Sequence, residues 1–160
     1  MAPLSLPDLT LLLPDETATA QLGRHLATKL RPGDSLLLQG PIGAGKSHLA
    51  RAFIRQLLGE VDVPSPSFTL VQTYEGPDCE IWHADLYRLT HPDEVLELGL
   101  EQAFDTAICL IEWPDRLGRF LPVGAMWLTL SSLGEGRQAQ LWLGQRAELR
   151  EGLLQGFHHA

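Results

Sequence analysis

One stretch of the sequence decides the fold: Gly40-Pro41-Ile42-Gly43-Ala44-Gly45-Lys46-Ser47. It matches the phosphate-binding loop pattern, in which a Gly and four further residues precede Gly-Lys and a Ser or Thr. The apolar residues 35–39 before it are typical of a short buried strand, and residues 48–58 after it have the spacing of an amphipathic helix. A strand, a glycine-rich loop and a helix in this order predict a site for the phosphates of a nucleotide.

The residue types of this loop suit an anion. Glycines lack a Cβ atom, so the backbone can turn tightly and its N–H groups can surround a phosphate. The N-terminus of the following helix adds the positive end of its dipole. We expect Lys46 to reach the β- and γ-phosphates and the hydroxyl of Ser47 to coordinate Mg²⁺. The residues of this loop that we expect to contact the nucleotide are Gly40, Ile42, Gly43, Ala44, Gly45, Lys46, Ser47 and His48.

Composition favours a single domain over residues 1–160. A chain of 160 residues is long enough to bury a sizeable core. The net charge is −8 and no cluster of Lys and Arg stands out along the sequence, so we expect any contact with nucleic acid to come through a partner. Two cysteines are too few for a disulfide scaffold or a zinc site. No apolar run reaches transmembrane length and the first residues lack the basic start of a secretory signal, so we expect a cytoplasmic protein that does not contact a membrane.

The rest of the chain alternates helix and strand patterns at first and shows paired strands later. Strands are predicted at residues 9–13, 68–74, 80–85, 107–111, 126–130 and 138–143, with 68–74 and 80–85 forming an antiparallel hairpin. Helices are predicted to open at 14–17 and run to about 30, to start at 91–94, and to cover 100–104 and about 147–157. This order predicts an α/β fold of the P-loop NTPase type, three-layered, with a mixed, mainly parallel central sheet and antiparallel additions.

Two acidic residues stand at the ends of predicted strands. Asp85 follows Ile81-Trp82-His83-Ala84, and Glu112 follows the apolar run 107–111. Ligands of open α/β sheets lie beyond the carboxyl ends of the strands, so we expect both carboxylates near the phosphates. One would stand on the metal side together with Ser47, and the other would orient the attacking nucleophile. The spacing does not decide which acid takes which role. It also leaves open that either residue is an ordinary helix cap or part of a surface salt bridge.

Three neighbouring residues have two interpretations each. His83 shares a strand face with Asp85, and it could take part in catalysis or coupling or be an ordinary core histidine. Arg88 could act as an internal arginine finger, or it could pair with Asp85. Trp113 could cover the site or serve only in packing.

The chain resembles the TsaE family (also called YjeE), small bacterial ATPases required for making threonylcarbamoyladenosine on tRNA. The resemblance rests on segments that occur in the family's order: Pro14-Asp15-Glu16-Thr17 with Leu22-Gly23, then Gly43-Ala44-Gly45-Lys46-Ser47, then Ser65-Pro66-Ser67-Phe68-Thr69-Leu70-Val71, then His83-Ala84-Asp85-Leu86-Tyr87-Arg88-Leu89, and Ile111-Glu112-Trp113-Pro114. The chain departs from the family where Pro41-Ile42 replaces the usual Asp-Leu and Ser47-His48 the usual Thr-Thr. The effect of Pro41 on the role of that position stays open.

The resemblance implies roles for particular residues. Hydrolysis of ATP with Mg²⁺ would require the catalytic residues Lys46, Asp85 and Glu112, and the residues near the metal would be Ser47, Glu112 and Asp85. Glu16 and Thr17 would approach the base or ribose. The connector at residues 65–69 would act as a switch that senses the γ-phosphate. The residues expected to switch or couple are Ser65, Ser67, Thr69, His83, Arg88 and Trp113.

The resemblance also implies partners. These are the transferase subunit TsaD and TsaB, which dimerises with it. Hydrolysis by the family is thought to reset that complex, and tRNA would be reached only through it. The family does not itself transfer the threonylcarbamoyl group.

Two other functions fit the loop. A small-molecule kinase would need an acceptor pocket and an arginine-bearing lid, for which Arg116 and Arg119 are the nearest candidates. A non-catalytic scaffold gated by a nucleotide would need only the loop. A GTPase is not expected, because the sequence contains no Asn and therefore lacks the guanine-reading Asn-Lys-x-Asp pattern.

Overall fold

The structure is a computed structural model that describes residues 2–159, without the side chains of residues 158 and 159. Its strands are β1 (Leu9–Leu13), β2 (Ser35–Gln39), β3 (Val71–Glu75), β4 (Glu80–Asp85), β5 (Ile108–Glu112), β6 (Met126–Leu133), β7 (Gly136–Trp142) and β8 (His158–His159). Its α-helices are α1 (Glu16–Ala27), α2 (Lys46–Leu58), α3 (Glu94–Leu98), α4 (Leu100–Thr106) and α5 (Arg150–Gln155). Two 3₁₀ segments, η1 (Pro114–Phe120) and η2 (Gly144–Leu149), complete the described elements.

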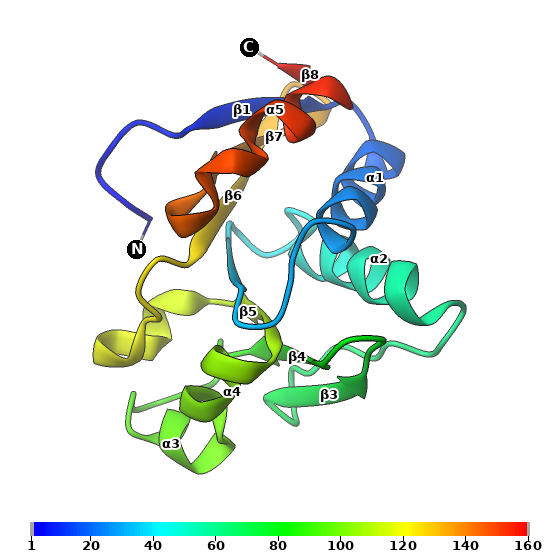
Figure 1. Ribbon diagram of the computed structural model, residues 1–160. Helices are drawn as coiled ribbons and strands as arrows, with labels where there is room; N and C mark the ends of the chain where they lie inside the picture. Colours follow the sequence, from blue (N-terminus) through cyan, green and yellow to red (C-terminus); the bar gives the residue numbers. More distant parts are fainter. Residues whose placement is uncertain (1, 160) are drawn as a thin grey trace.

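The strands form one eight-stranded sheet in the order β3-β4-β5-β2-β6-β7-β1-β8 (Figure 1). The central strands β4, β5, β2 and β6 run parallel to one another. Antiparallel neighbours extend the sheet at both edges, with β3 on one side and β7, β1 and β8 on the other. The predicted mixed α/β fold with antiparallel additions is therefore confirmed, as is the hairpin of β3 and β4.

Helices cover both faces of the sheet, because the central strands are apolar on both sides. Successive side chains of a strand point to opposite faces. Leu36 and Leu38 of β2 belong to the core under α1, α2 and α5, whereas Leu37 belongs to the core under α4 and η1. All five residues of β5 are buried, as expected for a parallel strand covered from both sides. No helix in the described residues is both long and apolar enough to cross a membrane.

The register of the parallel strands brings the two predicted acids together. Asp85, the last residue of β4, stands opposite Glu112, the last residue of β5. Glu112 stands in turn opposite Leu38 of β2, one residue before the end of that strand. The carboxyl ends of β4 and β5 therefore meet at the point where β2 leads into the glycine-rich loop.

Three predicted boundaries were wrong. Helix α1 ends before residue 30, because the hydroxyl of Thr28 donates to a backbone carbonyl of the last turn at 2.6 Å. Strand β3 starts at Val71 rather than at residue 68, because residues 66–69 form a turn and Leu70 has a φ of 68°. The predicted C-terminal helix is shorter than residues 147–157, since η2 precedes α5 and β8 follows it.

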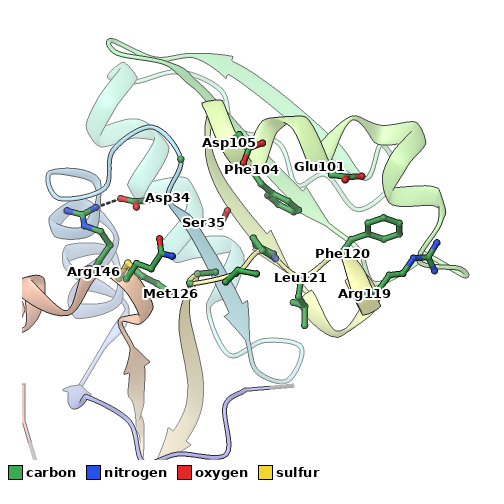
Figure 2. A pocket seen from close by; sticks show the side chains of 16 residues that line it. Asp34, Ser35, Glu101, Phe104, Asp105, Arg119, Phe120, Leu121, Met126 and Arg146 are labelled. Carbon is green, nitrogen blue, oxygen red and sulfur yellow. Dashed lines mark hydrogen bonds and ion pairs between the residues drawn. The ribbon is translucent and has the colours of Figure 1, made fainter.

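A buried ion pair ties the C-terminal part of the chain to the amino end of β2. Figure 2 shows Asp34 and Arg146 joined beside Ser35, the first residue of β2. The side chains of Arg146 and Asp34 are only 8% and 12% exposed. Arg146 also donates to the carbonyl of Lys29 at 3.2 Å, so one guanidinium links η2 to both ends of the turn before β2.

Replacement of Arg146 by Ala should therefore destabilise the fold strongly. It leaves the Asp34 carboxylate buried without its cation, for which a loss of about 3 kcal/mol is typical. The matched control is Arg119→Ala, which breaks the ion pair with Asp93. In that pair the Arg119 side chain is 66% exposed and the Asp93 side chain is 50% exposed. An exposed pair contributes less than about 1 kcal/mol. Urea unfolding of both variants measures the difference, and equal losses would contradict the structural role of Arg146.

Candidate nucleotide-binding site

The loop at residues 40–47 curves over the carboxyl end of β2 in a shape that requires glycine. Gly45 has a φ of 107° and is the N-cap residue of α2, which no side chain caps. A Cβ atom on Gly40 would lie 2.6 Å from the backbone oxygen of Leu130 on β6. The loop thus adopts the tight turn predicted for an anion cradle, and the uncapped N–H groups of the first turn of α2 are available to a ligand.

Lys46 lies folded back into the loop. Its side chain donates hydrogen bonds to the carbonyls of Gly40 and Pro41, and its Nζ atom is 4.5 Å from the ring centroid of Trp113. The residue is only 5% exposed. Burial lowers the pKa of the Lys46 ammonium, and the nearby carboxylates of Glu112 and Asp85 partly oppose that shift. An ammonium group whose hydrogen bonds in the described structure go to loop carbonyls can exchange those bonds for phosphate oxygens.

Glu112 is at the centre of a buried polar cluster. It is 2% exposed. The hydroxyl of Ser47 donates to its two carboxylate oxygens, at 3.0 and 3.1 Å. The Nε2 atom of His83 lies 2.7 Å from Oε2 of the same carboxylate. The other ring nitrogen of His83 is buried without a partner among residues 2–159, so the hydrogen bond to Glu112 is the interaction that orients the imidazole.

Asp85 contacts the connector instead of the loop. Its Oδ1 atom accepts from the backbone N–H of Tyr87 at 3.1 Å, and its Oδ2 atom accepts from the hydroxyl of Ser67 at 3.3 Å. The hydroxyls of Ser67 and Ser65 are 2.8 Å apart. The predicted switch segment therefore lies directly against one of the two strand-end acids.

Aromatic side chains line the open side of the site. Trp113 has a φ of 59°, a backbone conformation that bulky residues rarely adopt and that is often found at functional sites. The rings of Tyr87 and Trp113 lie 4.9 Å apart. Arg88 lies over the ring of Phe68, 4.4 Å from its centroid, and forms no ion pair with Asp85 in the described structure. The possible Arg88–Asp85 pair is therefore not found.

These groups enclose a cavity of about 480 Å³. The carbonyl of Glu16 on α1 closes one side through a 3.1 Å contact with Nε2 of His48. A smaller hollow of about 380 Å³ adjoins the loop on the side of α1 and the β6–β7 turn. The predicted site residues that line the first cavity are Glu16, Ile42, Gly43, Gly45, Lys46, Ser47, His48, Ser65, Ser67, Asp85, Arg88, Glu112 and Trp113; Ala44 lines the second.

Four predicted site residues do not line either cavity. Gly40 is half-buried, and its carbonyl accepts a hydrogen bond from Lys46. Thr17 is exposed on α1 and lies outside both cavities, so its neighbour Glu16 and the buried Thr19 take its place. The hydroxyl of Thr69 accepts from Gln72 at 3.0 Å instead of facing the cavity. The fourth residue, His83, lies behind Glu112.

The structure also adds residues that the sequence interpretation missed. Tyr87 lines the larger cavity, and its place within the Asp-Leu-Tyr-Arg-Leu segment was the signal that could have identified it. Arg137 lines the smaller hollow and donates to the carbonyl of Gly43 at 3.3 Å. No local signal points to Arg137, because β7 approaches the loop only once the sheet has formed.

A cavity of about 500 Å³ at the amino ends of the central strands is slightly larger than the cavity beside the loop (Figure 2). It is lined by Ser35 and Met126, the first residues of β2 and β6, and by aromatic side chains such as Phe104 and Phe120. Arg119, one of the two arginines considered for a kinase lid, lies here, paired with Asp93. Parallel sheets bind ligands at the carboxyl ends of their strands, so we place the candidate site there, in the cavity beside the loop.

Several known proteins with similar sequences carry the same description. Residues 13–139 match the family model described as "Threonylcarbamoyl adenosine biosynthesis protein TsaE". The tRNA threonylcarbamoyladenosine biosynthesis protein TsaE of Rickettsia felis is 39% identical over 129 residues, which cover 80% of this chain and 75% of the relative. The protein of the same name in Haemophilus influenzae is 33% identical, covering 83% of this chain and 88% of the relative. The crystal structure of Bacillus subtilis YdiB superposes with a TM-score of 0.74 at 26% identity, covering 92% of this chain and 94% of that chain.

Proposed function

The chain belongs to the TsaE family of tRNA threonylcarbamoyladenosine biosynthesis proteins, and we propose that it serves this pathway as a Mg²⁺-dependent ATP hydrolase of one domain in the cytoplasm. The observation that carries the proposal is the hydrogen bond between Ser47 and Glu112, which joins the phosphate-loop hydroxyl to a buried carboxylate at a strand end. A hydroxyl and a carboxylate held together beside a glycine-rich loop are the protein ligands that a metal-bound triphosphate uses.

The donor set fits Mg²⁺. This ion prefers oxygen ligands, keeps several waters and is usually held by one or two carboxylates together with the phosphates. Ser47 and Glu112 supply such oxygens within one hydrogen-bonded cluster. When bound, Mg²⁺ would neutralise charge on the phosphates. The chain's own residues would bind the phosphates and orient the attacking water.

Lys46 would release the carbonyls of Gly40 and Pro41 and donate to the β- and γ-phosphates. The backbone N–H groups of the loop and of the first turn of α2 would hold the phosphates in place. Glu112 would stand on the metal side, since it contacts Ser47. Asp85, which contacts Ser67 of the connector, would orient the attacking water near the γ-phosphate, so that movement of the connector and hydrolysis are coupled.

Apolar side chains around the mouth of the cavity support a protein partner at this face. Ile42, Phe68 and Tyr87 are 77%, 80% and 47% exposed, and all lie at or beside the opening. Large exposed apolar side chains that gather in one place are typical of interaction surfaces. We propose that TsaD, in its complex with TsaB, contacts this rim and that ATP hydrolysis resets the complex.

Phosphate release from ATP by the isolated chain should therefore be slow and should rise when TsaD and TsaB are added together. The expected cause is closure of the partner over Phe68 and Tyr87, which excludes water and orders the connector. Colorimetric phosphate assays with and without partners measure this. Fast transfer of phosphate to a metabolite, with no response to the partners, would instead indicate a small-molecule kinase.

His83 should act as a positioning residue for Glu112. His83→Ala removes the 2.7 Å hydrogen bond to Oε2, and loss of such a supporting partner typically lowers metal affinity or activity about tenfold or more. His83→Gln, whose amide can still donate, should recover most of the loss. Binding of Mn²⁺ in the presence of ADP, followed by electron paramagnetic resonance, gives a readout apart from turnover. Equal effects of Ala and Gln would show that the histidine serves only in packing.

A further inference from the structure

A cavity of about 400 Å³ between α1 and α2 gathers positive charge that is scattered in the sequence. Figure 1 shows the two helices side by side on one face of the sheet. Arg24 of α1 and Arg51 and Arg55 of α2 line this cavity together with His48. The sequence pattern does not predict such a cluster, because Arg24 joins the other two only when the helices pack.

The three arginines have no ion-pair partner in the part of the chain that the structure describes. The arginines that do form ion pairs there are Arg119, Arg146 and Arg150. Acidic residues outnumber Lys and Arg by 20 to 12 over the whole chain, so carboxylates are not scarce. One carboxylate, Glu60, also lines the cavity, and it pairs with none of the three arginines in the described structure. Cations left unpaired together in an acidic protein favour an external anion.

Two of the guanidinium groups are held in place by the backbone. The Nε atom of Arg51 donates to the carbonyl of Val63 at 3.4 Å, and that of Arg55 donates to the carbonyl of Val61 at 3.1 Å. Arg51 and Arg55 are four residues apart on α2 and therefore share one face. Each guanidinium has five N–H donors, so these bonds orient the group and leave its Nη donors without a partner among the described residues. The side chains need lose little further freedom on binding.

Phosphate is the anion that suits this arrangement. Planar guanidinium groups bind phosphate oxygens through paired N–H donors, and a row of them along a helix face can contact successive phosphates of a strand. The small side chains of Ala20 and Ala52 leave room between the helices. Since the family serves the biosynthesis of a tRNA nucleoside, we propose that the cavity lined by Arg24, Arg51 and Arg55 binds phosphodiester groups of an RNA backbone directly. This departs from the expectation, drawn from the net charge and from the resemblance, that RNA is reached only through a partner. His48 lines both this cavity and the candidate nucleotide site, so the two sites adjoin. The proposal does not depend on ATP hydrolysis.

The test is the binding of a fluorescently labelled tRNA transcript to the full chain, followed by anisotropy at low salt. Arg24→Glu is the main variant, because Arg24 is exposed and has no partner in the described structure whose loss would disturb folding. It should weaken binding about tenfold and make the dependence on salt shallower by about one unit of slope. Arg31→Glu, the matched control, makes the same charge change on an exposed residue in the turn before β2 and should bind as the unmodified chain does.

Competitors separate RNA from other anions. Inorganic tripolyphosphate at matched charge should displace tRNA poorly, and polyglutamate should also compete poorly. Displacement by tripolyphosphate at the same concentration as RNA would indicate a small-anion site, and equal competition by polyglutamate would indicate an acidic protein segment; either result overturns the proposal. Equal binding by Arg24→Glu and Arg31→Glu, or no binding by the unmodified chain, also overturns it.

The affinity for a fluorescent ATP analogue, measured on the same samples, keeps this inference apart from the proposed function. Arg24→Glu should leave that affinity unchanged, because Arg24 does not line the nucleotide cavity. Suppose that the unmodified chain fails to bind ATP but binds RNA, and that Arg24→Glu weakens the RNA binding. The proposed ATPase would then be wrong, and the RNA site would be retained.

Discussion

Replacing Glu112 by Gln should lower the rate of ATP hydrolysis about a hundredfold or more while leaving nucleotide binding intact. The variant keeps the shape of the side chain and removes the charge that faces Ser47 and His83. Loss of a charged group at the reacting centre commonly lowers rates by about 10²–10⁴. The loop, which supplies the phosphate donors, is unchanged. Affinity for ATP should therefore be retained or increase, since a negative charge near the phosphates is gone.

Single-turnover phosphate release gives the rate, and titration with a fluorescent ATP analogue gives the affinity. Glu101→Gln is the matched control, because Glu101 is an exposed acid that lines the cavity at the amino ends of the central strands. It should behave as the unmodified chain in both assays. A Glu112→Gln variant that hydrolyses ATP at the unmodified rate would remove Glu112 from the site.

Replacing Lys46 by Met should abolish most nucleotide affinity without weakening the folded protein. A charge-assisted hydrogen bond to phosphate contributes about 2 kcal/mol, so the Kd for ATP should rise about thirtyfold. Burial lowers the pKa of Lys46 in the folded protein, so the charged ammonium costs stability at neutral pH. Met has a similar length and no charge. The melting temperature without nucleotide should therefore stay the same or rise.

Thermal unfolding with and without ATP and Mg²⁺ measures both effects in one experiment. ATP should raise the melting temperature of the unmodified chain and hardly change that of Lys46→Met. Lys29→Met serves as the control, because Lys29 is the only other lysine in the sequence and lies outside the candidate site. A Lys46→Met variant that is stabilised by ATP as strongly as the control would show that the loop is not the phosphate site.

The parts of the site that lie within short segments could be predicted from the sequence. The glycine-rich loop is contiguous, and its strand and helix are read from their periodicity. The proximity of Asp85 and Glu112 could also be predicted from sequence, because both end apolar strands and parallel strands align their carboxyl ends.

Contacts between distant segments could not be predicted in the same way. The bond of His83 to Glu112 depends on the register of β4 and β5, which an apolar pattern buried on both faces leaves unspecified. The arginine cluster required the packing of α1 on α2. The predicted start of β3 was too early. Phe68 and Leu70 are residue types common in strands, but the chain turns there and places Ser67 against Asp85.

A crystal structure of the chain with a non-hydrolysable ATP analogue and Mg²⁺ tests the central claim most directly. The claim is that the loop at residues 40–47 holds the phosphates and that Ser47 and Glu112 stand at the metal. The expected result is Nζ of Lys46 within hydrogen-bonding distance of the β- and γ-phosphates, with the metal beside the Ser47 hydroxyl and the Glu112 carboxylate. Phosphates bound at the amino-end cavity of Figure 2, or a metal held away from both residues, would contradict it.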